Sequence, residues 1–475
     1  MKIGVKNDKS VREMMLTGSL TKVILKMAYP SILAMIISSI YSLADTYFVS
    51  SLGTNATAAV SVNSSIDNII MMAGSFLAVG ANSYIARLLG AGDKNTAERT
   101  LATAFFISMG IGSVLLVGGL SFLKPMVRFL GATETCEQYS MDYARFVLLA
   151  APFMAANFVL NQCLRSEGHS FLSMVGMGVG GIINIILDPI FIFGGLGLPA
   201  MGVAGASMAT AISKLISFIL LLSPYLLRKT GLHLTIRQLR PSWTIIKQIA
   251  AIGSSALFRS LFAVVAAILM NRIAGQYSDS LLAGIGVSNK IMMFPFGIIL
   301  GYGTGYQPVV GFNYGSKHYA RVTECYKTAS RISLIGAVVM AVILMALSRL
   351  FIHLFAGDDA EMVKFGSICI ISQAVMLPVH AWVLIINMLC SGMGRGKDAL
   401  LLSVARQGLF FIPTLLLLRW LFAEYGIAVT QAVADLLTIA MAIPIRQNVL
   451  RYLREAAEAQ KAGEGEAPLE PAAEA

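Results

Sequence analysis

The chain has 475 residues, of which 56% are hydrophobic and only 13% are charged. Because about a quarter of the residues of a soluble domain are charged, this composition excludes a soluble globular protein and indicates a polytopic membrane protein. The formal net charge of +11 does not indicate nucleic-acid binding, since the basic residues are dispersed between apolar spans, where they act as topology signals.

The first 26 residues are polar and basic and contain no apolar core of the kind that a cleavable signal peptide needs. We therefore expect them to form a cytoplasmic segment. The five cysteines are scattered, mostly within apolar runs. Their spacing predicts neither a metal site nor a disulfide framework.

A membrane-spanning helix needs about 20 mainly apolar residues. Twelve such stretches follow in the chain, at 27–50, 57–83, 100–123, 143–163, 171–194, 203–226, 248–270, 281–307, 328–350, 365–389, 399–420 and 426–448. Most of the 36 lysines and arginines lie in the N-terminal segment, in the even-numbered loops and at the C-terminus. This asymmetry predicts that both termini face the cytoplasm.

The predicted fold class is an all-α polytopic membrane protein, and an internal repeat at an offset near 224 predicts two pseudo-symmetric six-helix bundles around a central cleft. The sequence predicts an N-terminal lobe and a C-terminal lobe with a cytoplasmic linker between them. We expect the tail to be disordered because it is rich in Ala, Glu and Pro. The predicted parts are the N-terminal segment 1–26, the N-lobe 27–226, the linker 227–247, the C-lobe 248–450 and the tail 451–475.

Asp45 is the one charged residue between Lys26 and Asp67. A carboxylate at the centre of a membrane helix costs about 2.5–3.5 kcal/mol on insertion scales. Asp45 lies 19 residues after Lys26, which places it roughly 28 Å from the cytoplasmic edge at the rise of an α-helix. A specific role must compensate this cost.

Asp188 lies 19 residues after His169 and so reaches the same height as Asp45. Asn184 precedes Asp188 by four residues and shares its helix face, while Pro189 removes a backbone N–H and can free a carbonyl oxygen. Thr210 reaches a similar level from the outer side in the next span. Two carboxylates, an amide and a hydroxyl at one height can bind a hard monovalent cation through oxygen or hold a proton.

The two halves of the chain resemble each other at an offset near 224. The segments "GDKNTAERT" (92–100) and "GSKHYARVT" (315–323) correspond, as do Pro189 and Pro413. Because each half has an even number of spans, the repeats share one orientation, which is typical of transporters. The C-terminal half has no counterpart of the aspartate pair and carries Arg259, Lys290, Arg406 and Asp435 instead. We therefore expect a coupling site in one lobe.

Five segments together resemble the multidrug and toxic compound extrusion (MATE) family, and more closely its bacterial multidrug exporters. The resemblance covers roughly residues 15–450. The segments are "SLADTYFVSSLG" in the first span, "LRSEGHS" after the fourth, "NIILDPIFIFGGLG" in the fifth, "GVAGASMATAIS" in the sixth and "GFNYGSKHYARV" after the eighth. The resemblance implies two six-helix lobes and export of amphipathic cations in exchange for Na⁺ or H⁺. It also implies that the protein lies in the cytoplasmic membrane of a bacterial cell.

The family's cation site uses an Asp of the first helix, an Asn and an Asp of the fifth and a Thr of the sixth. By motif, the resemblance assigns these roles, including a possible Na⁺ site, to Asp45, Asn184, Asp188 and Thr210. This sequence differs from the family pattern at Ser50, where glycine is frequent. It also lacks the carboxylate that some members carry on the seventh helix and has Arg259 nearby.

The first, second, seventh and eighth spans should line the drug cleft. Methionine-rich walls suit varied ligands, and the segment "KIMMFPFG" offers Lys290, Met292, Met293 and Phe294. Asp67 in the second span could pair with a cationic ligand or with Lys290. An internal ion pair is an equally good interpretation.

The sequence predicts a cation-coupled antiporter for amphipathic cationic drugs. The alternative is a flippase for lipid-linked oligosaccharides, which would use Arg259, Lys290 and Arg406 to hold pyrophosphate. An intramembrane enzyme would need a nucleophile and base or a metal cluster, whereas His380 stands alone among apolar residues. We expect no cofactor other than Na⁺ or H⁺ as coupling ion, no nucleic-acid partner, contact with membrane lipid and a monomeric protein.

Overall fold

A computed structural model describes residues 11–195, 197, 199–356 and 359–462. These residues form helices and connecting turns, and no strand occurs among them. This is the arrangement that a lipid environment imposes, because a helix satisfies every backbone N–H and C=O within its own segment. The predicted all-α membrane fold is confirmed.

Eleven helices of the described part are long and apolar enough to cross a membrane. The last of these continuous stretches, Gly396–Ala462, has 67 residues, about three times the length that one crossing needs. Within it, Ala423 has a non-helical backbone (φ 48°, ψ −123°) that separates two helical runs. The stretch therefore provides two crossings, in agreement with the twelve predicted from the sequence.

The chain divides into two compact units. The N-terminal unit contains residues 11–14 and Tyr29–Gly253, and the C-terminal unit contains Met15–Ala28 and the residues from Ser254 onward. Two helices contribute to both units, α2 (Leu20–Ser50) and α9 (Trp243–Ala274). The unit boundaries therefore fall inside these helices and not in the loops that precede them.

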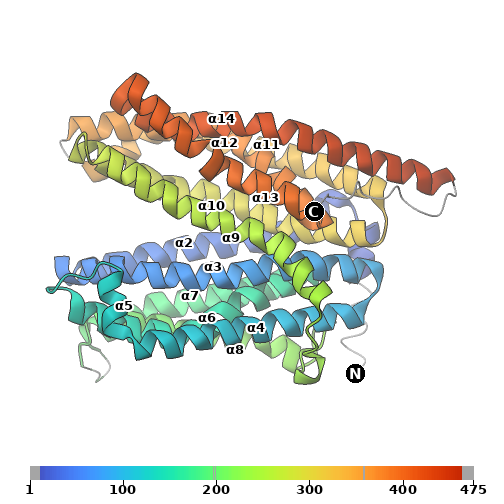
Figure 1. Cartoon of the computed structure of the whole chain (residues 1–475), viewed down its shortest axis with the longest axis horizontal. Coiled ribbons are helices and arrows are strands. Elements are labelled where there is room, and N and C mark those ends of the chain that lie inside the picture. Colours follow the sequence, from blue (N-terminus) through green and yellow to red (C-terminus); the bar gives the residue numbers. More distant parts are fainter. Residues whose placement is uncertain (1–10, 196, 198, 357–358, 463–475) are drawn as a thin grey trace. The chain divides into compact units, whose positions relative to one another are not determined.

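The N-terminal unit is built around α6 (Glu137–Ser166), which packs against α3, α4 and α8 and is the most buried helix of this unit. Figure 1 shows these helices running alongside one another. Besides part of α2, the unit contains α3 (Thr54–Ala91), α4 (Lys94–Ser121), α5 (Leu123–Phe129), α7 (Ser170–Phe193), α8 (Val203–Leu226) and the short 3₁₀ turn η1 (Ile236–Gln238).

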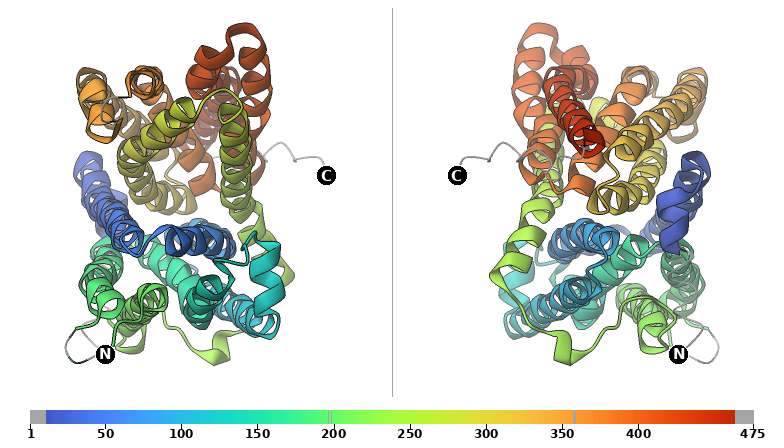
Figure 2. Two further views of the ribbon diagram at one scale, coloured as in Figure 1. Left: turned by 90° about the vertical axis from the view of Figure 1, so that its left-hand side faces the viewer. Right: turned by 90° about the vertical axis from the view of Figure 1, so that its right-hand side faces the viewer.

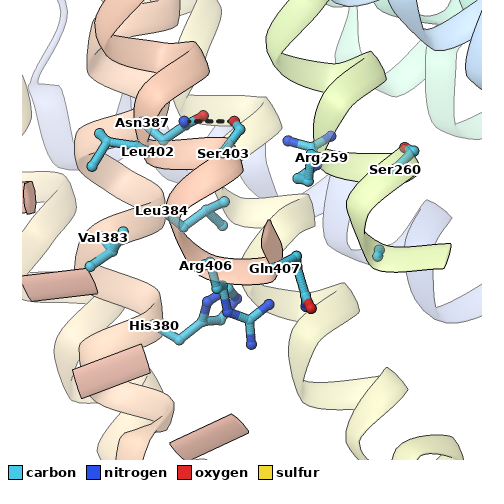
Figure 3. A pocket seen from close by; sticks show the side chains of 11 residues that line it. Arg259, Ser260, His380, Val383, Leu384, Asn387, Leu402, Ser403, Arg406 and Gln407 are labelled. Atoms are coloured by element: carbon cyan, nitrogen blue, oxygen red, sulfur yellow. Dashed lines mark hydrogen bonds between the residues drawn. The ribbon is translucent and has the colours of Figure 1, made fainter. Parts of the chain in front are cut away.

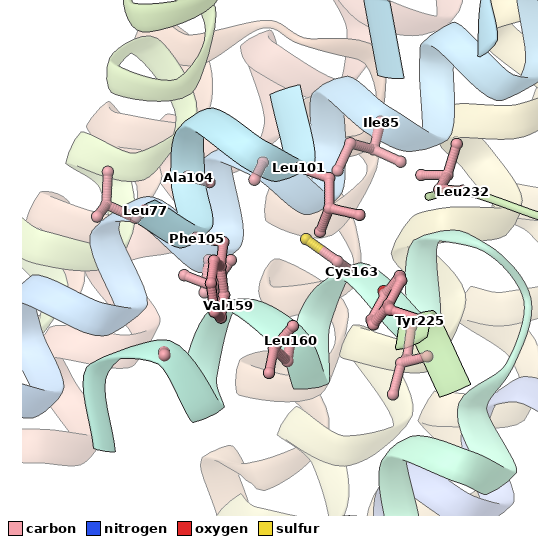
Figure 4. Packing of buried hydrophobic residues seen from close by; sticks show 14 of the residues in the cluster. Leu77, Ile85, Leu101, Ala104, Phe105, Val159, Leu160, Cys163, Tyr225 and Leu232 are labelled. Carbon is pink, nitrogen blue, oxygen red and sulfur yellow. The ribbon is translucent and has the colours of Figure 1, made fainter. Parts of the chain in front are cut away.

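Side chains from four of these helices meet in one apolar core (Figure 4). Leu77 of α3, Phe105 of α4, Leu160 of α6 and Tyr225 of α8 belong to it. Small residues let the helices approach. A Cβ atom on Gly112 of α4 would lie 2.4 Å from Cα of Pro152 on α6, so no larger residue fits there without movement of the helices.

The C-terminal unit repeats this plan around α12 (Ala360–Met393), which packs against α10, α11 and α14. Figure 2 shows the helices nearly along their axes. The remaining elements are α10 (Asp279–Gly315), α11 (Tyr319–Ala356), α13 (Gly396–Val404), the π-helical turn η2 (Ala405–Leu409) and α14 (Phe411–Ala462). Residues 451–462, predicted to belong to a disordered tail, continue α14 as helix, and residues 463–475 lie outside the described part.

The segment Met15–Ala28 is anchored on α10. The side-chain amide of Asn313 donates to the carbonyl of Met15 at 3.2 Å, and a Cβ on Gly305 would lie 2.4 Å from Cα of Ala28. The beginning of α2 is thus held by the C-terminal unit, while the rest of α2 carries Asp45 into the N-terminal unit.

Candidate functional site

Asn184 and Asp188 lie one turn apart on α7 and are joined by a hydrogen bond. The Asn184 Nδ2 group donates to Oδ1 of Asp188 at 3.1 Å. Both side chains are buried, with 3% and 0% of their surface exposed. The helix continues through Pro189 to Phe193, and because proline has no N–H, the carbonyl of Ile185 lacks its usual helical donor.

Thr210 of α8 joins this pair. The Nδ2 group of Asn184 donates to Oγ1 of Thr210 at 3.3 Å, and α7 and α8 pack against each other along their length. A Cβ on Gly205 of α8 would lie 2.4 Å from the carbonyl oxygen of Phe191 on α7. The glycine therefore permits the close approach that brings Thr210 to Asn184.

Asp45 reaches the same region from α2. Its charge interacts with that of Asp188, although no hydrogen bond among the described residues joins Asp45 to Asn184, Asp188 or Thr210. The structure thus brings three of the four predicted coupling residues into one hydrogen-bonded group and places the fourth within electrostatic reach.

The site has more acceptors than donors. Asp45 Oδ1, Asn184 Oδ1 and Asp188 Oδ2 are buried and lack a hydrogen-bond partner, and the same holds for Oδ1 of Asp67. Buried acceptors without donors are rare in native proteins because each costs free energy. A bound proton or a hard cation such as Na⁺ would satisfy these oxygens, since such cations prefer oxygen ligands. The residues present therefore fit the ion that exchange would require.

Lys214 and Tyr41 complete the site and were not predicted as part of it. The Lys214 ammonium donates to the Tyr41 hydroxyl at 3.2 Å and lies 4.8 Å from the centre of its ring. Lys214 also interacts electrostatically with Asp45 and Asp67. The signal was present in the spacing: Lys214 follows Thr210 by four residues and Tyr41 precedes Asp45 by four, so each shares a helix face with a predicted residue.

The residues predicted for a drug cleft belong to two units. Asp67 lies on α3 of the N-terminal unit, whereas Lys290, Met292, Met293 and Phe294 lie on α10 of the C-terminal unit. Met292 is buried, Phe294 is partly buried, and Lys290 and Met293 are exposed. The pairing of Asp67 with Lys290 stays a prediction, and within its own unit Asp67 interacts with Lys214.

The membrane carboxylate of the C-terminal unit has a partner. Asp435 on α14 accepts from Nε of Arg406 at 2.6 Å and from Nη2 at 3.3 Å, and Gln431 donates to it at 3.0 Å. Because three hydrogen bonds and one positive charge satisfy this carboxylate, it differs from the unpaired acceptors of the N-terminal unit.

Comparison with known proteins agrees with this fold. The profile of the MatE family matches residues 30–190 and 256–417. The chain is 29% identical over 420 residues to the multidrug export protein MepA of Staphylococcus haemolyticus, covering 88% of this chain and 91% of that protein. The corresponding protein of Staphylococcus aureus strain NCTC 8325 is 27% identical over 426 residues, covering 89% of this chain and 93% of that protein.

Solved structures of membrane transporters are similar over most of the chain. A structure described as an outward-facing conformation of a multidrug resistance MATE family transporter superposes with a TM-score of 0.85 at 25% identity, covering 92% of this chain and 97% of that chain. A crystal structure of MATE in complex with MaL6 gives a TM-score of 0.86 at 25% identity, covering 92% of this chain and 98% of that chain. These matches do not favour the flippase predicted as the alternative function.

Proposed function

Since this chain belongs to the MatE family of membrane transporters, we propose that it is an antiporter that exports amphipathic cationic drugs across the bacterial cytoplasmic membrane in exchange for Na⁺ or H⁺. Its role is transport and not enzymatic catalysis. The names of its relatives, multidrug export proteins, support drug export, and the distribution of basic residues supports cytoplasmic termini.

The observation that carries cation coupling is the excess of buried acceptors at Asp45, Asn184 and Asp188. Without a cation, three oxygens lack donors and two carboxylates interact across a medium of low dielectric. A bound proton or Na⁺ removes both costs. The ion therefore has a large differential affinity for the state in which these side chains converge, which is the requirement for an ion to shift a conformational equilibrium.

Exchange follows if drug and ion use the same negative charge. A cationic drug is stabilised by the carboxylates of Asp45 and Asp67, and an ion bound at Asp45 and Asp188 reduces that stabilisation. Binding of one then weakens binding of the other by the same factor, because coupling between two sites is reciprocal. Lys214 lies among these carboxylates and lowers the remaining negative charge when neither ligand is bound.

Purified protein in proteoliposomes tests this proposal directly. A Na⁺ gradient and a pH gradient are imposed separately, and transport of ethidium, a fluorescent cation, is followed with time. We expect one of the two gradients to drive transport against the ethidium gradient and Asp188→Asn to abolish that transport. Asp142→Asn serves as control, because Asp142 pairs with Arg145 outside the site. An ethidium transport rate that is the same with and without either gradient would contradict cation coupling.

A further inference from the structure

A cavity lined by both polar and apolar side chains lies in the C-terminal unit, apart from the site described above. It has a volume of about 250 Å³ and is lined by residues of α9, α12, α13 and η2. Figure 3 shows Arg259 on α9 across this cavity from Arg406 and His380. Apolar side chains of Val383 and Leu384 form part of the wall.

The charges around this cavity do not cancel. Arg406 is paired with Asp435, and its guanidinium also lies 5.0 Å from the ring centre of Phe296. Arg259 lines the same cavity, and no hydrogen bond or ion pair reaches it from the part of the chain that the structure describes. One positive charge therefore remains, and an uncompensated arginine at membrane depth is costly unless a ligand or water meets it.

The cavity also contains a ring nitrogen, on His380, that has no hydrogen-bond partner among the described residues. This nitrogen, Nδ1, is buried, and the ring packs edge-to-face on Phe296 with the centroids 5.0 Å apart. Asn387 and Ser403, by contrast, satisfy each other at 3.1 Å and complete the polar end of the cavity (Figure 3).

The backbone at this cavity departs from a regular helix. Residues Ala405–Leu409 wind as a single π-helical turn, a feature that is frequent at functional sites. Gly408 in this turn lies against α9, where a Cβ atom would stand 2.8 Å from the ring of Phe262. The wide turn and the glycine together bring Arg406 and Gln407 to the cavity wall opposite Arg259.

We propose that this cavity binds the anionic head group, a phosphate, sulfonate or carboxylate, of an amphipathic molecule. The planar guanidinium of Arg259 suits two parallel hydrogen bonds to such a group, Gln407 offers a further donor, and the apolar wall accommodates the adjoining hydrocarbon. The anion supplies the charge that Arg259 lacks. The inference concerns the C-terminal unit alone and does not depend on cation coupling at Asp45 and Asp188.

The test uses the full chain in nanodiscs of phosphatidylcholine, titrated with octyl phosphate by isothermal calorimetry. We expect saturable binding at one site and a loss of affinity of about tenfold or more in Arg259→Gln, since a charged hydrogen-bonding group is removed. Arg259→Lys keeps the charge but loses the two parallel hydrogen bonds, so its affinity should lie between those of the parent and Arg259→Gln. Arg272→Gln should bind as the parent does, because Arg272 lies on the same helix, is exposed and does not line the cavity.

A second variant tests the space in the cavity independently of the charge of Arg259. Ala263 lines the cavity, and Ala263→Phe fills it while Arg259 stays in place, so binding should be lost here too. Nanodiscs that contain phosphatidylglycerol distinguish the sources of the anion: competition with octyl phosphate identifies a lipid head group, and unchanged affinity identifies a free amphipathic anion. The proposal is wrong if the parent does not bind octyl phosphate, or if Arg259→Gln and Ala263→Phe bind it as the parent does.

Discussion

Asn161 on α6 and Asn387 on α12 make the same interaction in the two units. Asn161 donates to the carbonyl of Ser173 at 3.2 Å and Asn387 donates to the carbonyl of Ala399 at 2.8 Å. The two donors differ by 226 in residue number, and so do the two acceptors. This difference is close to the offset of the sequence repeat. Each asparagine ties the central helix of its unit to the next helix in the chain.

The first prediction concerns Asp45 and Asp188 together. Asp45→Asn and Asp188→Asn should each abolish ion-driven efflux, because either change removes one of the two carboxylates that we propose hold the coupling ion. The double variant should be no worse than either single variant, since residues that act as one unit are non-additive. Ethidium efflux in proteoliposomes with matched protein content measures this. Partial losses that simply add would show that the two carboxylates do not form one site.

The second prediction concerns Lys214. Its charge interacts with Asp45 and Asp67, so under the proposed mechanism it competes with the coupling cation for them. Lys214→Met should therefore raise the affinity for the coupling ion on the order of tenfold, the effect of removing a nearby like charge at moderate dielectric. Thermal stabilisation by Na⁺ or by lowered pH reports this affinity, because a ligand that binds the native state raises its stability.

Two further variants serve as a comparison and a control for Lys214→Met. Tyr41→Phe removes the hydroxyl that accepts from Lys214 at 3.2 Å but keeps the ammonium charge, so its effect on ion affinity should be smaller. Lys229→Met serves as control because Lys229 is exposed in the same unit. If Lys214→Met leaves the half-saturating concentrations of both Na⁺ and H⁺ unchanged, this lysine does not weaken binding of the coupling ion.

The third prediction concerns packing of α4 on α6. Gly112→Ala places a Cβ 2.4 Å from Cα of Pro152 and should destabilise the protein by about 1–3 kcal/mol, as overpacking does. Gly110 lies on the same helix, and a Cβ atom there would have no neighbour within 4 Å. Gly110→Ala should therefore leave stability unchanged or raise it by about 0.4–1 kcal/mol. Melting midpoints of the purified variants compare the two, and equal midpoints would contradict the close approach.

The fourth prediction concerns the cap of α4. Oδ1 of Asp93 accepts from the backbone N–H of Thr96 at 3.0 Å. Hydrogen bonding to the side chain of Thr96 first, and to its backbone second, lowers the pKa of Asp93 below its ordinary value. The folded state thus favours the charged form. The stabilisation is present above the unfolded pKa of about 3.9 and is lost as the pH falls through the lower folded pKa.

Hydrogen exchange in the first turn of α4 measures this cap. Asp93→Ala should weaken protection by about 1 kcal/mol at neutral pH, the usual contribution of a helix cap, and its difference from the parent should shrink in acid. Asp93→Asn keeps an acceptor oxygen without a titrating charge, so its protection should not depend on pH in this range. A constant difference between Asp93→Ala and the parent at all pH values would show that the carboxylate charge contributes nothing.

The sequence by itself determined which segments cross the membrane. The predicted span 203–226 coincides with α8, and 171–194 differs from α7 by one residue at each end. This succeeds because a span in lipid satisfies its hydrogen bonds internally, so its existence depends on local composition alone. The same local rule placed Asn184 and Asp188 on one face of one helix.

Only the tertiary structure decided which side chains from different helices meet. The bond from Asn184 to Thr210, the contact of Lys214 with Tyr41 and the pairing of Arg406 with Asp435 each join two elements. The π-helical turn at η2 and the break at Ala423 were likewise absent from the predicted spans. These features depend on how closely the helices approach one another. Glycines such as Gly205 and Gly408 permit the close approach through contacts with residues distant in the chain. Hydropathy along the sequence carries no information about such contacts.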